Sequence, residues 1–132
     1  MGAKKRATKK KRAKASSTKA LRTFALSLPA AWEDYPWGER VVKVGKKVFV
    51  FMGKPLEAKF GLSVKLPKSK RQALAMDFTE PTGYGLGKSG WVSAVFTGKR
   101  SVPIDLLKQW IEESYRAVAP AHMVKELDAR EA

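Results

Sequence analysis

The sequence predicts an α+β fold: a two-layer sandwich of one antiparallel sheet with helices packed on one face, preceded by a disordered basic arm. Three observations lead to this prediction. Runs rich in β-branched and aromatic residues cluster in the middle of the chain, as strands do. Apolar residues recur at helical spacing on either side of them. The first 19 residues lack the apolar side chains of a core, and the 132-residue chain has room for about one domain.

The first element in order is the arm, predicted over residues 1–18. Residues 1–19 contain nine bases and no acid, which leaves +6 of the formal net charge of +15 for residues 20–132. Such a block repels itself and cannot bury apolar surface until polyanions neutralise it. The arm's candidate nucleic-acid contacts are Lys4, Lys5, Arg6, Lys9, Lys10, Lys11, Arg12 and Lys14. The alternative interpretation of the arm is a solubility tail.

A first helix is expected to begin after the cap-forming residues 16–18 and to end at Pro29. Its apolar residues follow at i, i+3, i+4 and i+7, namely Leu21, Phe24, Ala25 and Leu28. In the next segment Pro36 and Gly38 stop regular structure, and the aromatic rings supply packing area. Trp37 is therefore expected in the interior.

The middle of the domain is expected to contain four antiparallel strands. They cover residues 40–44, 47–52, 60–66 and 91–96, and Gly45-Lys46 between the first two predicts a hairpin. Ser69 is expected to cap a short basic helix that runs to Met76. Trp91, which opens the last strand, is expected to be buried because large rings dominate protein interiors.

The strongest helical pattern opens at Pro103 and is interrupted by Pro120. One face of this helix carries Leu107, Trp110, Ile111, Ser114 and Val118. Trp110 and Tyr115 are expected to pack against the sheet. The remaining residues, 120–132, are predicted to form a tail with one or two helical turns, so the folded domain is placed at residues 19–119.

The residues exclude most catalytic and metal chemistry, so we expect no enzyme, cofactor or metal site. The chain has no cysteine and one histidine, His122, which is expected to be exposed. Residues 83–89 are similar to a phosphate-binding P-loop, but Thr82 occupies the position of the first glycine and a strand follows. A turn leading to Trp91 is the expected structure. Pairing with Lys or Arg accounts for acids such as Glu33 and Glu112.

The excess of bases indicates a polyanionic partner. The expected partner is nucleic acid, DNA rather than RNA. The contacts are expected to be to phosphates and independent of sequence, because no basic recognition helix is evident. The domain's candidate contacts are Lys43, Lys46, Lys47, Lys65, Lys68, Lys70, Arg71 and Lys88. The side chain of Lys43 could point to either face of its strand. The alternative is an adaptor that binds a protein or ligand. The absence of long apolar segments favours a cytoplasmic location and no membrane partner; the oligomeric state is left open.

A succession of short motifs resembles one family. The motifs are Leu28-Pro29, Pro36-Trp37-Gly38, Lys43-Val44, Lys47-Val48-Phe49, Val64-Lys65-Leu66, Gly90-Trp91-Val92 and Ser114-Tyr115 with Val118. Over about residues 20–119 their order and spacing are similar to those of MmcQ/YjbR proteins. The resemblance implies a fold similar to that of the frataxin-like CyaY proteins and a role in DNA binding. Two departures are the segment 85–90, which lacks the Asn/His residues of many relatives, and the arm before residue 20, which is not part of the family's common domain. The first helix carries Lys19 and Arg22 and no acid, which argues against an iron site of the frataxin-like kind.

Overall fold

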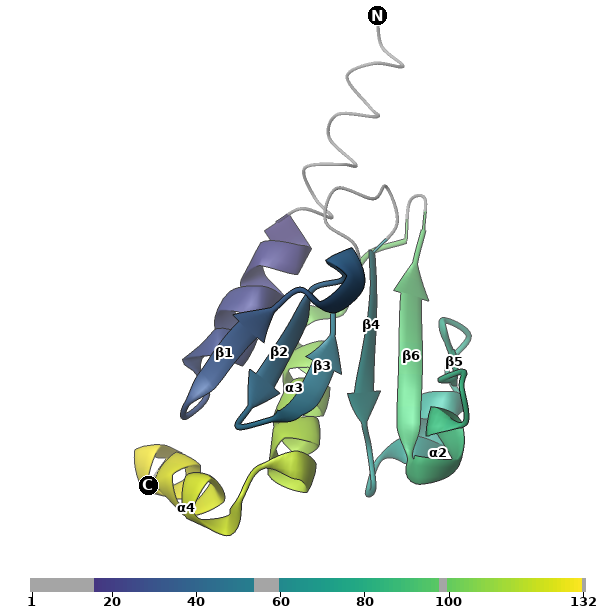
Figure 1. Ribbon diagram of the computed structural model, residues 1–132. Helices are drawn as coiled ribbons and strands as arrows, with labels where there is room; N and C mark the ends of the chain where they lie inside the picture. Colours follow the sequence, from purple (N-terminus) through teal and green to yellow (C-terminus); the bar gives the residue numbers. More distant parts are fainter. Residues whose placement is uncertain (1–15, 54–59, 98–99, 132) are drawn as a thin grey trace, which may run out of the picture.

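An antiparallel sheet of six strands is the centre of the structure, a computed structural model that describes residues 16–53, 60–97 and 100–131 (Figure 1). The strands are β1 Ala31–Asp34, β2 Val41–Val44, β3 Lys47–Phe51, β4 Phe60–Lys65, β5 Thr79–Pro81 and β6 Trp91–Phe96. Their order across the sheet is β1-β2-β3-β4-β6-β5. The helical elements are an N-terminal helix over residues 16–27, η1 Pro36–Gly38, α2 Lys70–Leu74, η2 Leu86–Ser89, α3 Ile104–Val118 and α4 Ala121–Glu131.

The predicted two-layer α+β fold is confirmed, and the four predicted strands are present as β2, β3, β4 and β6. The two edge strands were not predicted. β1 has four residues of which two are acids, and β5 has three residues and ends in Pro81. Acids and proline are depleted in strands, and proline is tolerated only at an edge. The C-terminal segment forms an 11-residue helix, α4, which is longer than the one or two turns expected.

The hairpin between β2 and β3 follows from its two-residue loop. Val44 pairs with Lys47, and Gly45 between them has a φ of 60°. A positive φ at the first central position is the conformation that a type II′ turn requires and that glycine adopts without steric cost. The expected hairpin is therefore confirmed, and its turn presents Lys46 to solvent.

The core lies between the sheet and the helices behind it (Figure 1). Alternate residues of two inner strands face this layer, namely Phe60, Leu62 and Val64 of β4 and Val92, Ala94 and Phe96 of β6. The helices contribute Leu21, Ala25, Leu107, Trp110, Ile111 and Tyr115. The ring of Tyr115 meets Phe49 edge to face at 5.2 Å, and its hydroxyl donates to the carbonyl of Pro29 at 2.6 Å. Burial raises the pKa of Tyr115, so the phenol stays a neutral donor.

Trp91 and Trp37 were both predicted to be buried, but only Trp91 is. Trp91 is 8% exposed and packs against Phe51 at 5.4 Å on the outer face of the sheet, so its predicted burial is confirmed. The interior position predicted for Trp37 is wrong, because this side chain is 93% exposed. Trp37 lies in η1 with φ 56° and ψ 29°, a left-handed conformation that costs a non-glycine residue about 1–2 kcal/mol. This turn holds the ring outside the sheet, which a count of aromatic residues does not reveal.

Candidate nucleic-acid interface

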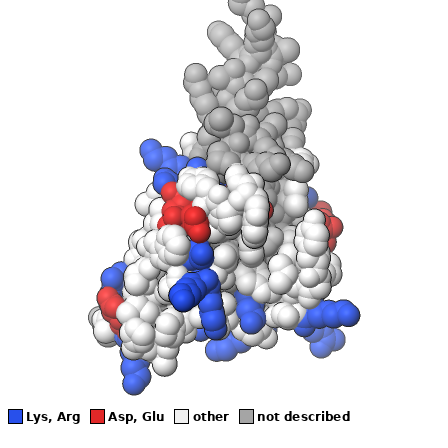
Figure 2. Space-filling view, in the orientation of Figure 1, with Lys and Arg blue, Asp and Glu red and all other residues white. Residues whose placement is uncertain are grey.

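Seven of the predicted phosphate contacts lie at one end of the sheet, which we call the basic rim. Because neighbouring strands run in opposite directions, the β2–β3 turn, the end of β4 and the start of β6 fall at the same end (Figure 1). The rim consists of Lys46 and Lys47 at the turn, Lys65 at the end of β4, Lys68, Lys70 and Arg71 around the start of α2, and Lys88 in η2. Figure 2 shows Lys and Arg side chains gathered toward this end.

The bases of the rim are not neutralised by carboxylates. Within residues 16–53, 60–97 and 100–131, none of the seven takes part in an ion pair. Most of them are exposed, whereas Lys65 and Lys70 are half-buried. Unpaired and exposed ammonium groups leave a positive potential at this end of the sheet that attracts polyanions.

The remaining predicted contact of the domain, Lys43, differs from the rim. Its ammonium group lies 3.3 Å from the carboxylate of Asp34 and 4.8 Å from the centroid of the Trp32 ring. Both partners belong to β1, and Lys43 pairs with Trp32 across the strands. Lys43 therefore faces the outer side of the sheet, and it is already neutralised.

Two consecutive residues of α3 hold the segment that carries Lys65 and Lys68. Ser114, which is fully buried, accepts a hydrogen bond from the backbone N–H of Lys65 at 2.8 Å and donates to the carbonyl of Phe49. Its hydroxyl thereby bridges β4 and β3 beyond the Val50–Val64 pair, where the direct ladder ends. The bridge fixes the end of β4, from which the rim begins.

Glu113 caps the short helix α2. Its carboxylate accepts hydrogen bonds from the backbone N–H groups of Lys68 and Ser69, both at 3.0 Å, and from the hydroxyl of Ser69 at 2.6 Å. The predicted cap was the side chain of Ser69 itself, which makes no capping bond to α2. A carboxylate at a helix start satisfies free N–H groups and interacts favourably with the helix dipole. The cap orders the turn that presents Lys68, Lys70 and Arg71.

Lys70 connects α2 to η2. Its ammonium group donates to the carbonyl of Gly87 at 2.9 Å. Gly87 is closely packed, since a Cβ atom there would lie 3.0 Å from Pro81 and 3.1 Å from the carbonyl oxygen of Thr82. η2 passes through Gly90, at φ 94°, directly into β6, so no α-helix follows. Residues 83–89 therefore do not form a P-loop, and the segment is the turn expected before Trp91.

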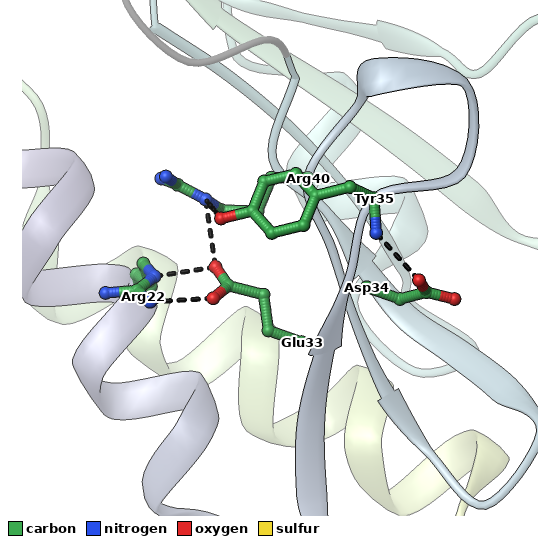
Figure 3. Close-up of polar contacts among 5 residues, drawn as sticks. All are labelled: Arg22, Glu33, Asp34, Tyr35 and Arg40. Atoms are coloured by element: carbon green, nitrogen blue, oxygen red, sulfur yellow. Dashed lines mark hydrogen bonds and ion pairs between the residues drawn. The ribbon is translucent and has the colours of Figure 1, made fainter.

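Acids and arginines pair mainly away from the rim, and one such group joins the N-terminal helix to β1 (Figure 3). Arg22 donates to the two carboxylate oxygens of Glu33 at 2.6 and 2.7 Å, and Nε of Arg40 lies 2.9 Å from the same carboxylate. The hydrogen bond from Arg22 lowers the pKa of Glu33, and the charge of Arg40 adds to this effect. Glu33 therefore serves ion pairing, as does Glu112 with Arg116 at 3.6 Å.

Exposed aromatic rings lie on both sides of β1, which the sequence did not predict. Trp32 lies on the side of Lys43 and Asp34, whereas the ring of Tyr35 lies beside Glu33 and Arg40 (Figure 3). Trp32 and Tyr35 are 42% and 46% exposed, and Trp37 follows them in η1. Bases lie over two of the rings: Lys43 over Trp32, and Arg40 over Tyr35 at 5.7 Å.

Other chemistry finds little support among the described residues. No group of three or more His, Cys, Asp or Glu side chains within residues 16–53, 60–97 and 100–131 could hold a metal ion. No helix in the same part of the chain is long and apolar enough to cross a membrane. His122 is exposed on α4, as expected. The eight candidate contacts of the arm, Lys4 to Lys14, lie outside the described residues.

Comparison with known proteins agrees with this architecture. A family model described as YjbR matches residues 26–117, a range that contains all six strands and the basic rim. A search of curated proteins gave no match. Since the family match covers more than half of the chain and confirms the resemblance expected from the motifs, the chain belongs to the YjbR family.

Proposed function

We propose that this protein binds nucleic acid, DNA rather than RNA, through phosphate contacts made by the basic rim and supplemented by the N-terminal arm. The observation that carries the proposal is the rim itself: seven bases from four separate segments meet at one end of the sheet, and none of them is held in an ion pair within the described residues. Phosphate contacts of this kind position a nucleic acid without reading its sequence.

The composition of the rim supports backbone contacts rather than base recognition. Six of its seven bases are lysines, which act as point charges, whereas bidentate recognition of a guanine edge typically uses arginine. The one arginine, Arg71, belongs to α2, a helix of five residues. A recognition helix in the major groove normally presents several side chains to base edges. We therefore propose a non-enzymatic, cytoplasmic protein with little sequence preference.

Duplex-binding titrations test the proposal. Replacing Lys46 and Lys88 together with Glu should weaken binding to a labelled duplex by about 10- to 100-fold at about 50 mM salt, because each substitution removes a base that neutralises a phosphate. The matched control replaces Lys108 and Lys125 with Glu, which changes the net charge equally but lies on α3 and α4. Equal weakening by both variants would indicate a general charge effect. Absence of binding by the wild-type protein would leave the adaptor function as the alternative.

A further inference from the structure

We propose that Tyr84 stacks on an unpaired nucleobase next to the phosphates held by the basic rim, so that the protein prefers a duplex that continues into a single strand. This inference rests on the proposed function and specifies its ligand more closely. Nucleobases inside a duplex are stacked on one another, whereas an unpaired nucleobase offers a free face to an aromatic ring. An exposed ring at the rim therefore distinguishes the two kinds of nucleic acid.

Tyr84 lies in the connection between β5 and β6, at the end of the sheet that carries the rim. Pro81, the last residue of β5, pairs with Val92 near the start of β6. Residues 82–90 therefore join two antiparallel strands at the end of the sheet where β6 begins (Figure 1). The same connection contains η2 with Lys88. Tyr84 thus shares both its segment and its end of the sheet with a basic residue of the rim.

A tight turn holds the backbone of Tyr84. The N–H of Leu86 donates to the carbonyl of Gly83 at 3.2 Å, and the two residues between them, Tyr84 and Gly85, have φ angles of 59° and 77°. Two consecutive positive φ angles are characteristic of a type I′ turn. The backbone that carries the ring is therefore ordered before a ligand binds, which lowers the entropic cost of binding.

Tyrosine is an unfavourable residue at this position of the turn. The first central residue of a type I′ turn is normally Asn, Asp or Gly, because the left-handed conformation is strained for other residues. The side chain of Tyr84 is fully exposed, and its ring has no aromatic or cationic partner among the described residues. The ring thus contributes nothing to the core that would offset the strain. Strain of this kind is found at ligand-binding positions.

The charges around this connection favour a nucleic acid as the ligand. Helix α2 packs beside β5 and β6, and the basic residues of this half of the rim are Lys65, Lys68, Lys70, Arg71 and Lys88. Of the acids nearby, Asp77 pairs with Arg100 and Glu113 caps α2, which leaves Glu80 of β5 among the described residues. Positive charge is therefore in excess. A nucleic acid carries both negative phosphates for the rim and flat aromatic groups for the ring.

The rim is long enough to hold several phosphates before the ring is reached. Three strand spacings of about 4.8 Å separate the β2–β3 turn from the β5–β6 connection, or about 15 Å in all. Successive phosphates of one duplex strand follow at about 3.4 Å along the axis, so this length corresponds to about four of them. The nucleobase that meets Tyr84 therefore lies at the end of the paired region that the rim holds.

The test uses the full-length protein and three labelled probes: a duplex with 5′ and 3′ thymidylate overhangs, the same duplex with abasic overhangs of equal length, and a blunt duplex. Wild type should bind the thymidylate overhangs about 5- to 150-fold more tightly than the abasic ones, the range for one stacked nucleobase. Tyr84→Asn removes the ring, keeps the net charge and suits the turn, so it should abolish this preference. Tyr84→Phe should retain most of it. Binding of the blunt duplex should be unchanged in both variants.

Trp37→Asn is the matched control. Trp37 is also exposed and left-handed, at φ 56°. It lies in η1, which connects β1 to β2 at the opposite end of the sheet from the rim. The control should keep the preference of wild type within about twofold, a smaller change than one stacked nucleobase contributes.

Four results would contradict the proposals. Equal binding of the two overhangs by wild type, or a preference that persists in Tyr84→Asn, would overturn the inference and leave the proposed function standing. Loss of the preference in Trp37→Asn would overturn the assignment to Tyr84. A melting temperature of Tyr84→Asn several degrees below that of wild type would assign the ring a structural role and overturn the inference. If wild type binds none of the probes, the proposed function itself fails.

Discussion

The side chain of Ser114 and the backbone of Lys65 are joined by a hydrogen bond of 2.8 Å between α3 and the last residue of β4. The same hydroxyl donates to the carbonyl of Phe49, so one buried atom bridges two strands at the point where the basic rim begins. Helix α3 thus does more than cover the core, because it also determines where the rim starts. The candidate interface is rigidly attached to the fold at this position.

Ser114→Ala should destabilise the domain by about 1–3 kcal/mol, because it leaves the part-buried N–H of Lys65 and the buried carbonyl of Phe49 without this partner. Urea denaturation measures the change in the free energy of unfolding. Ser27→Ala is a suitable control: Ser27 is exposed, and its hydroxyl donates only to the carbonyl of Phe24. The control should change stability by less than about 0.5 kcal/mol. Equal stability of the two variants would show that the bridge contributes nothing.

Two tryptophans should respond differently to removal. Trp91→Ala should cost about 3–5 kcal/mol, because Trp91 is buried against Phe51. Trp37→Ala should change the free energy of unfolding by less than about 0.5 kcal/mol, since its exposed ring packs against little. Thermal and urea denaturation of both variants give the comparison. A cost above about 2 kcal/mol for Trp37→Ala would contradict its exposed position.

The ion pairs of Glu33 predict a dependence of stability on pH. Its pKa in the folded protein lies below the ordinary value of 4.5, mainly because of the hydrogen bond from Arg22. The carboxylate therefore contributes stability above pH 4.5, and this contribution is lost as the pH falls through the lowered value. Glu33→Gln should be less stable than wild type at neutral pH, and the difference should shrink on acidification. A difference that stays constant between about pH 7 and pH 2 would contradict this linkage.

Much of the fold could be predicted because local patterns and tertiary packing agree. The alternation in Phe60–Lys65 and the spacing of Leu107, Trp110 and Ile111 follow directly from which faces are buried. β1 could not be predicted, because its strand conformation depends on pairing with β2. Its two acids, Glu33 and Asp34, are tolerated there because Arg22 and Lys43 form ion pairs with them. Such partners are distant in sequence, so a local pattern contains no signal for them.

The sequence predicts the residues of the candidate site but not their arrangement, because the arrangement depends on contacts between segments that are far apart in the chain. The bases of the rim are visible in the sequence, but their meeting at one end of the sheet depends on strand direction. The cap that Glu113 provides to Ser69 spans 44 residues and has no local signature. The exposure of Trp37 results from one left-handed turn between β1 and β2, which an aromatic residue seldom adopts.

Deletion of residues 1–15 should leave the melting temperature nearly unchanged, because that segment supplies no large apolar residue beyond Met1 for a core. A loss of more than a few degrees would show that the arm stabilises the domain. If roughly six of the arm's bases contact phosphates, the deletion should also reduce the slope of log affinity against log salt by about five. The binding that remains then belongs to the domain.

The salt dependence of duplex binding by the full-length protein tests the central proposal most directly. Replacing Lys46, Lys47 and Lys88 with Gln removes three bases of the rim without adding negative charge. If the rim contacts phosphates, the magnitude of the slope of log affinity against log salt should fall by about 0.9 for each phosphate that is no longer neutralised, or about 2–3 in total. A slope equal to that of wild type would contradict the account, because the rim would then make no contact with phosphate.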